Sequence, residues 1–182
     1  GGRNQYPPGA GVPELLEAIA AHQQRFYGVV VDPGADVLVT VGATEAIAAT
    51  ILALVSPGDE VVTFEPYYDS YAATIALAGG VRRTSVLRFP EFAVDEASLR
   101  AAFSARTRLV LLNTPHNPTG KVFTRAEIEL ICALAREFDA WVVTDEVYEH
   151  LTFDEVEHVH VASLPGMWER TLTISSAGKT FS

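Results

Sequence analysis

The chain has 182 residues, 48% of them hydrophobic, with a formal net charge of −10 and a sequence pI near 4.9. This composition is sufficient for a folded core and argues against disorder. Because phosphate backbones bind to basic patches, the acidic charge argues against nucleic acid as a main partner. No apolar run approaches the length of a membrane span, and the single cysteine, Cys132, excludes a disulfide frame, so we expect a cytoplasmic protein without membrane contact.

Helical and strand patterns alternate along the sequence. The first half predicts a helix over residues 13–27, a strand over 37–41, a helix over 44–55, a strand over 60–64 and a helix over 67–78. The second half predicts a strand over 81–87, a short helix from Asp95, a strand over 108–113, a helix over 124–138, and strands over 140–144 and 171–175.

This alternation predicts the fold class. Several of the expected strands are continuous apolar runs, which is typical of an α/β fold with three α/β/α layers around a mostly parallel sheet. The only candidate boundary separates an extended N-terminal arm, residues 1–12, from one domain over residues 13–182. In such sheets ligands gather beyond the carboxyl ends of the strands.

Lys179 is one of only two lysines and follows the β-branched run at residues 171–174. A lysine that forms an imine with an aldehyde cofactor needs such a place at a strand end, partly desolvated so that its amine can lose a proton near neutral pH. Lys121 is the only competitor for this role. The alternative is that Lys179 is an ordinary solvated surface lysine.

A second candidate feature lies between the expected strand at 37–41 and the next helix. The backbone N–H groups of Gly42, Ala43 and Thr44 and the helix dipole can accept a phosphate there, and Gly42 permits close approach. A tight turn capped by Thr44 is the alternative. Neither GxxxxGK[ST] nor GxGxxG occurs, so the sequence predicts no P-loop and no dinucleotide fingerprint.

Asp145 follows the apolar strand at 140–144, where a carboxylate needs a cationic partner. A protonated pyridine nitrogen is one such partner, and the carboxylate would keep it cationic and so strengthen the ring as an electron sink. The alternatives are a turn cap or, with Glu146, a Mg²⁺ ligand. Tyr148 and Asn117 are placed to hydrogen-bond a phenolic oxygen of the same ring.

Aromatic and histidine side chains complete the candidate residues. Tyr67, Tyr68 and Tyr71 form a cluster from which one ring can stack on a planar cofactor, although such a cluster is also typical of packing. His158 and His160 alternate with valines, but no third ligand of suitable spacing appears, so we expect no metal site.

Six sequence runs resemble a known family. NQYPPG, VTVGATEAI, GDEVVTFEPYYDSY, NTPHNPTGKV, TDEVYE and LPGMWERTLTISSAGKTFS are similar to the fold-type-I class I aminotransferases, which depend on pyridoxal 5′-phosphate (PLP). Within that family they resemble the kynurenine/glutamine transaminase and cysteine-conjugate β-lyase branch, and bacterial N-succinyldiaminopimelate aminotransferases are similar through the same segments. The resemblance covers nearly the whole chain and implies the large, PLP-binding domain of that fold.

The resemblance assigns a role to each matching residue. It implies that Lys179 bonds to PLP and then carries a proton between the substrate Cα and the C4′ carbon. Asp145 would pair with the pyridine nitrogen, Asn117 and Tyr148 would contact the phenolic oxygen, and Tyr68 would stack on the ring.

The resemblance also implies a phosphate site and a dimer. Ala43, Thr44 and Ser176 would hold the phosphate, and Tyr6 would reach the phosphate of a partner subunit in a homodimer. The family's further cationic phosphate ligand and its substrate-binding arginine have no matching position, so we expect the chain to be a fragment, truncated just after the lysine and inactive alone.

The expected activity of the full-length protein is transfer of an amino group from an amino acid to a 2-oxo acid. Arginine outnumbers lysine by 11 to 2, which hints at a GC-rich bacterial source and favours N-succinyl-diaminopimelate as the donor, in lysine biosynthesis. Three alternatives remain open: β-elimination from cysteine S-conjugates, a PLP-binding regulatory module, and a nucleotide-binding domain that uses no PLP.

Overall fold

The computed structural model describes residues 6–181, which form two compact units that divide between Val41 and Gly42. The first unit contains helix α1 (Pro13–Tyr27). The second contains strands β1 (Glu60–Glu65), β2 (Val81–Val86), β3 (Thr107–Asn113), β4 (Trp141–Asp145) and β5 (Thr171–Ile174). Its helices are α2 (Gly42–Leu54), α3 (Ser70–Leu77), α4 (Glu96–Ala102), α5 (Arg125–Glu137) and α6 (Ala177–Thr180), with 3₁₀ turns at Val161–Ser163 and Trp168–Arg170.

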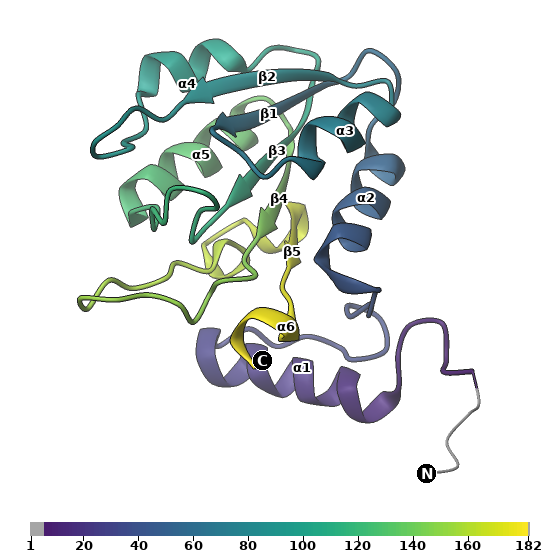
Figure 1. Cartoon of the computed structure of the whole chain (residues 1–182). Coiled ribbons are helices and arrows are strands. Elements are labelled where there is room, and N and C mark those ends of the chain that lie inside the picture. The colour runs from purple at the N-terminus through teal and green to yellow at the C-terminus, as the bar shows by residue number, and fades with distance from the viewer. Residues whose placement is uncertain (1–5, 182) are drawn as a thin grey trace. The chain divides into compact units, whose positions relative to one another are not determined.

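The five strands form one parallel sheet in the order β2-β1-β3-β4-β5. Helices α2 and α3 lie on one side of it, and α4 and α5 lie on the other (Figure 1). Alternate residues of β3 enter two separate cores: Leu109 and Leu111 pack in the α2/α3 core, whereas Val110 and Leu112 pack in the α4/α5 core. This is the α/β/α arrangement predicted from the apolar strands.

Local sequence signals explain the element ends. Thr124 and Glu127 form the expected capping box, in which each side chain accepts from the other residue's backbone N–H; α5 begins directly after Thr124 and contains Glu127 in its first turn. The Asp95 side chain accepts from Ser98 N–H at the start of α4. Gly28 ends α1 in the left-handed conformation, as its position predicts.

Residues 37–41 are the clear exception, because the strand predicted there is wrong. Leu38 and Val41 are 67% and 88% exposed, and no described strand pairs with this segment. Its Val39 N–H donates to the Ala10 carbonyl at 2.9 Å. An apolar run of strand-forming residues becomes a strand only beside an edge that satisfies its backbone groups.

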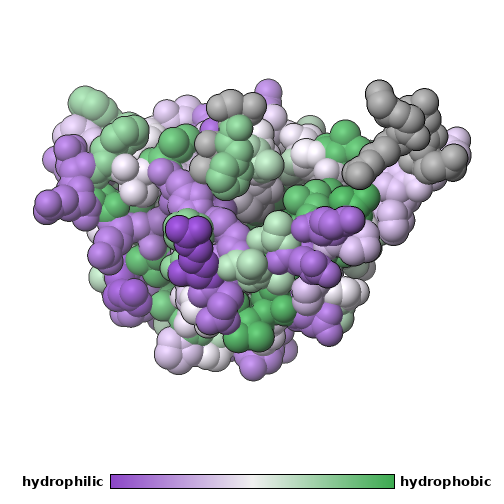
Figure 2. Space-filling model, turned by 90° about the horizontal axis from the view of Figure 1, so that it is seen from below, coloured by the Kyte–Doolittle hydropathy of each residue, from purple (hydrophilic) through white to green (hydrophobic). Residues whose placement is uncertain are grey.

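The remaining boundaries are close to the predictions, and helix α3 begins at Ser70 rather than residue 67. Of the expected arm, residues 1–12, the described residues 6–12 lie in the first unit with α1, and residues 1–5 lie outside the described part. Among residues 6–181 no helix combines the length and apolarity that a membrane crossing requires. Hydrophobic patches on one face are separated by hydrophilic residues (Figure 2).

Candidate functional site

The strand order creates a switch point between β1 and β3. The chain passes from β1 outward to β2 and then returns to place β3 on the other side of β1. In open parallel sheets ligands bind beyond the carboxyl ends of the strands at such a point. The segment that follows β1 carries Tyr68, and the loop that follows β3 carries Asn117. The register also pairs Asp145 with Asn113 on one side and with Ile174 on the other.

Asp145 is a buried carboxylate, 4% exposed, at the carboxyl end of β4. The Tyr71 hydroxyl donates to its Oδ2, and Val147 N–H donates to Oδ1 over 3.4 Å. Burial raises the pKa of Asp145 above its ordinary value, although the hydrogen bond from Tyr71 and the charge of Lys179 act in the opposite direction. Within residues 6–181 no cationic side chain forms an ion pair with it, so a cationic ligand group would stabilise its charged form.

The Tyr71 phenol stays protonated and donates a hydrogen bond to Asp145. Burial and the nearby Asp145 charge raise the pKa of the Tyr71 phenol well above its ordinary value, so the hydroxyl stays a donor at neutral pH. Its ring meets the Tyr68 ring edge-on, with centroids 5.7 Å apart. Sequence reasoning identified Tyr71 only as a member of an aromatic cluster. The spacing of three residues from Tyr68, at the start of α3, is the signal that places both rings at one site.

Asn113 connects the loop after β3 to the end of β4. Its side-chain amide donates to the Asp145 carbonyl at 2.8 Å, and its Oδ1 accepts from Asn117 N–H at 2.7 Å. Thr114 N–H donates to the same Asp145 carbonyl at 3.1 Å. Asn113 is buried, so these bonds hold Asn117 at a defined place relative to Asp145. Its role was not recognised from the sequence.

Lys179 lies in α6, directly after β5. Its Nζ is 5.7 Å from the centroid of the Tyr148 ring, and its charge acts on Asp145, so these three residues belong to one site. The expected partial desolvation of Lys179 is absent: the side chain is exposed, because α6 follows an edge strand of the described sheet. Ser176 caps α6 by accepting from Gly178 N–H at 3.2 Å.

The candidate phosphate site is the start of α2. Gly42 has a φ of 77°, which a residue with a side chain rarely adopts, and Ala43 and Thr44 follow in the first turn. The first N–H groups of a 13-residue helix point out of this end. Ala43 and Tyr68 pack against the same core. Tyr6 belongs to the first unit and is fully exposed.

The family identity follows from comparison with known proteins. A model of the family "Aminotransferase class I and II" matches residues 1–182. The chain belongs to this aminotransferase family. A probable N-succinyldiaminopimelate aminotransferase of Mycobacterium tuberculosis is 52% identical over 184 residues, which cover 100% of this chain and 46% of the relative. The methionine aminotransferase of Escherichia coli is 47% identical over 180 residues, covering 99% and 47%.

Solved aminotransferase structures are similar to this one. The N-succinyldiaminopimelate aminotransferase from Mycobacterium tuberculosis superposes with a TM-score of 0.96 at 52% identity, covering 99% of this chain and 47% of that one. The Escherichia coli protein YbdL, with a methionine aminotransferase function, gives a TM-score of 0.95 at 47% identity, covering 99% and 48%. The chain thus spans slightly less than half the length of the aminotransferases it matches.

His116 joins two segments of the candidate site. Its ring contacts the Pro66 backbone, and its Nδ1 lies 2.8 Å from the Thr119 hydroxyl. The Thr119 hydroxyl oxygen also accepts from Lys121 N–H at 3.2 Å, so this one hydroxyl connects the His116 ring to the backbone of Lys121. Burial lowers the pKa of His116 to about 4, so the ring is neutral at pH 7. The segments that carry Asn117 and Tyr68 are thereby tied together.

We expect acid to destabilise the protein through His116. Its folded pKa of about 4 lies below the unfolded value of about 6.5, so the unfolded chain binds more protons between these values. The free energy of unfolding should therefore fall by up to about 1.4 kcal/mol per pH unit as pH decreases from about 6.5 to 4. Urea unfolding at several pH values checks this: H116Q should have a shallower slope, and an unchanged slope would contradict the assignment.

Proposed function

We propose that residues 13–182 form the PLP-binding domain of an aminotransferase that moves an amino group from an amino acid to a 2-oxo acid. The observation that carries the proposal is the buried Asp145 carboxylate beside Lys179 at the carboxyl ends of a parallel sheet. Enzymes of this family depend on PLP, and the relatives' names support amino-group transfer. The fraction of each relative that is matched supports the view that the rest of the active site lies outside these 182 residues.

The chemistry of the side chains fits PLP. When bound, PLP supplies a conjugated pyridinium ring that accepts the electron pair left when the amino acid loses its Cα proton. Asp145 has no ion-pair partner in residues 6–181 and would hold the proton on the ring nitrogen. The Lys179 amine would bond to the aldehyde carbon and later carry the proton to and from Cα.

Other residues would orient the ring. Asn117, held by Asn113, and Tyr148, beside Lys179, would hydrogen-bond the phenolic oxygen. Tyr68 would stack on the ring face, supported from the side by Tyr71. These groups come from the loops after β1, β3 and β4, so the fold itself sets the plane of the ring.

The phosphate would lie at the start of α2. The backbone N–H groups in the first turn of α2, at Gly42, Ala43 and Thr44, and the helix dipole favour an anion there. The Thr44 and Ser176 hydroxyls would complete the site. The chain's net charge of −10 repels phosphate, so binding would depend on these local N–H groups and hydroxyls.

We also propose that the protein is a cytoplasmic homodimer in which Tyr6, on the arm formed by residues 1–12, reaches the phosphate of the partner subunit. The full exposure of Tyr6 and the buried, free Cys132 thiol support these two points. For the substrate we propose N-succinyl-diaminopimelate, as part of lysine biosynthesis. The 52% identity with the relative that carries this substrate in its name supports that choice.

Covalent labelling tests the proposal. PLP is added to the full-length protein that contains these residues, the product is reduced with borohydride, and the labelled peptide is identified by mass spectrometry. We expect the label on Lys179, its loss in K179A, and its retention in K121M, because Lys121 is already paired with Glu127 at 2.9 Å. Label on Lys121, or no label, would overturn the proposal.

A further inference from the structure

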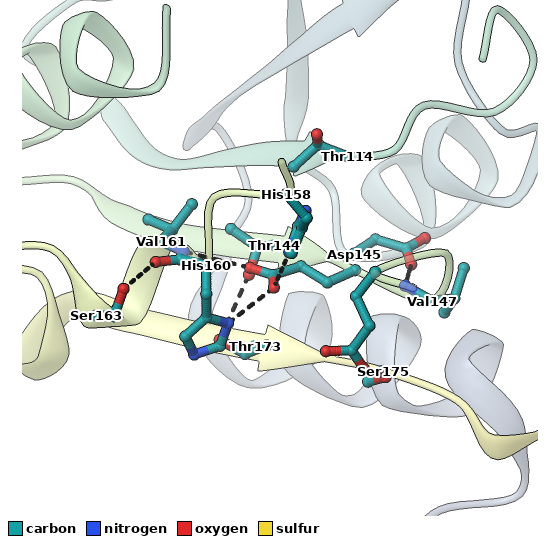
Figure 3. Close-up of polar contacts among 12 residues, drawn as sticks. Thr114, Thr144, Asp145, Val147, His158, His160, Val161, Ser163, Thr173 and Ser175 are labelled. Atoms are coloured by element: carbon teal, nitrogen blue, oxygen red, sulfur yellow. Dashed lines mark hydrogen bonds and ion pairs between the residues drawn. The ribbon is translucent and has the colours of Figure 1, made fainter. Parts of the chain in front are cut away.

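Glu146 follows Asp145 and is completely buried, with a side-chain exposure of 0%. Its Oε2 lies 2.7 Å from His158 Nε2 and 2.8 Å from His160 Nδ1, and its Oε1 lies 3.5 Å from Val161 N–H. Figure 3 labels His158 and His160, whose rings form these contacts, and shows the Asp145 side chain pointing away from both. Spacing along the sequence shows no third partner for the two histidines. The fold brings Glu146 to both.

The geometry indicates hydrogen bonds rather than a metal site. Distances of 2.7 and 2.8 Å are those of N–H donors on a carboxylate. A tetrahedral zinc ion would hold its ligand atoms about 3.4 Å apart, given bonds of about 2.1 Å. Burial alone would raise the pKa of Glu146, but the bonds from His158 and His160 outweigh it and hold that pKa at about 2. Glu146 is therefore ionised at neutral pH, with both rings donating to it.

The backbone of Glu146 connects this buried cluster to the cofactor-facing residues. Its N–H donates to the Ile174 carbonyl at 2.7 Å, at the end of the strand that leads to Lys179. Its carbonyl accepts from Glu149 N–H at 2.9 Å, which closes the turn containing Tyr148. The Ser175 hydroxyl donates to Glu149 Oε1 at 2.5 Å, which is a second link between this turn and the segment after β5.

We propose that Glu146, held by His158 and His160, is a positioning residue for the cofactor site. Its side chain anchors the turn after β4 from the side of the sheet opposite Asp145. That anchor keeps Asp145, Tyr148 and the start of the Lys179 segment at fixed separations. The inference rests on the proposed PLP function, and it extends that function to three side chains that do not touch the cofactor.

A matched pair of variants in the full-length protein tests the role. E146Q keeps the shape of the side chain but replaces the carboxylate that accepts from His158 and His160 with an uncharged amide. E60Q is the control: Glu60 is also buried and accepts from Ser104 and Arg106 at 2.6 Å each, but it lies at the amino end of β1. PLP affinity, the absorption spectrum of the bound cofactor and the melting temperature are measured for each. We expect both variants to melt earlier and E146Q alone to bind PLP about tenfold more weakly, with an altered spectrum.

Conservative replacements of the histidines give a rescue test. The Gln amide nitrogen in H158Q and the Asn amide nitrogen in H160N lie near the ring nitrogens that donate to Glu146. We expect these two variants to bind PLP within about threefold of the wild type, and H158L and H160L to resemble E146Q.

The outcomes separate the two proposals. If the wild-type protein binds no PLP, the proposed function itself fails. If the wild type binds PLP and E146Q binds it equally well, or E60Q weakens binding as much as E146Q, the positioning role is overturned and the function stands. Stoichiometric zinc in the purified protein, with PLP affinity lost on chelation, would also overturn it in favour of a metal site.

Discussion

Replacing Lys179 with alanine is expected to reduce amino-group transfer by about 10³-fold or more. Under the proposed function the Lys179 amine would have two tasks: it would hold the cofactor through the aldehyde carbon, and it would move the proton at the substrate Cα. A positioned acid–base group alone contributes about 10²–10⁴-fold. The variant should still bind PLP without a covalent bond, since Asp145, Tyr68 and the start of α2 are unchanged.

The measurement is kcat of the full-length protein with an amino donor and a 2-oxo acid. K121M is the control, because Lys121 pairs with Glu127 and its removal should lower the melting temperature while kcat stays within a few-fold. Added small primary amines should restore part of the activity of K179A, because they replace the missing proton carrier. Activity of K179A near the wild-type level would exclude Lys179 from the reaction.

The layers of this fold can be predicted from the sequence because each β-strand is recognisable from its own apolar residues. In β4, Val142 packs in the α4/α5 core and the adjacent Val143 packs in the α2/α3 core, so both faces are apolar. Because β4 is predicted as a parallel strand that ends at Asp145, the sequence alone places this carboxylate at the carboxyl edge of the sheet. The same argument places Lys179 beyond β5.

Which side chains contact one another at the site cannot be predicted from the sequence in this way. Tyr71 lies 74 residues before Asp145, and His158 lies 12 residues after Glu146 in a segment without regular structure. No periodicity relates such pairs, because their contact depends on how separate elements pack. Only three-dimensional information distinguishes Tyr71, which bonds to Asp145, from Tyr67, which lies under the Arg82 guanidinium.

The missing strand at residues 37–41 has a related cause. The apolar, β-branched composition describes what a segment prefers, but a strand also needs an edge with which to pair. Sequence periodicity contains no information about whether that edge is present. The first unit therefore differs from its prediction, while the other five predicted strands pair in one sheet.

Replacing Asp145 with asparagine is expected to lower kcat/KM by about 10²–10⁴-fold. Asparagine keeps the size of the side chain and can still accept the Tyr71 hydroxyl, but it carries no charge to hold the proton on a ring nitrogen. Breaking a buried ion pair costs about 3–5 kcal/mol, and each 1.4 kcal/mol in the barrier changes the rate tenfold. Steady-state kinetics of the full-length protein measure this, and a loss of less than tenfold would contradict the assigned role.

The same variant should be more stable than the wild type when PLP is absent. Burial raises the folded pKa of Asp145 above its unfolded value of about 3.9, so its charged form destabilises the folded protein at neutral pH. Well below pH 3.9 the Asp145 carboxyl is protonated in both the folded and the unfolded wild type, so position 145 is neutral in both proteins. The wild type and D145N should then unfold alike. The difference should grow as pH rises from about 3.9 to the folded pKa, where it is complete, because only the unfolded chain has lost the proton in that range. Each 1 kcal/mol gained corresponds to roughly 2–4 °C in melting temperature.

Adding PLP should reverse the order of the two proteins. The wild type gains the ion pair with the ring nitrogen and is stabilised in proportion to its tighter binding, whereas the D145N protein gains little. The test is to record melting curves of the wild type and D145N at pH 7 and pH 3.5, each with and without PLP. If D145N melts earlier than the wild type at pH 7 without PLP, then Asp145 stabilises the folded chain by itself, and its burial is structural rather than a preparation for the cofactor.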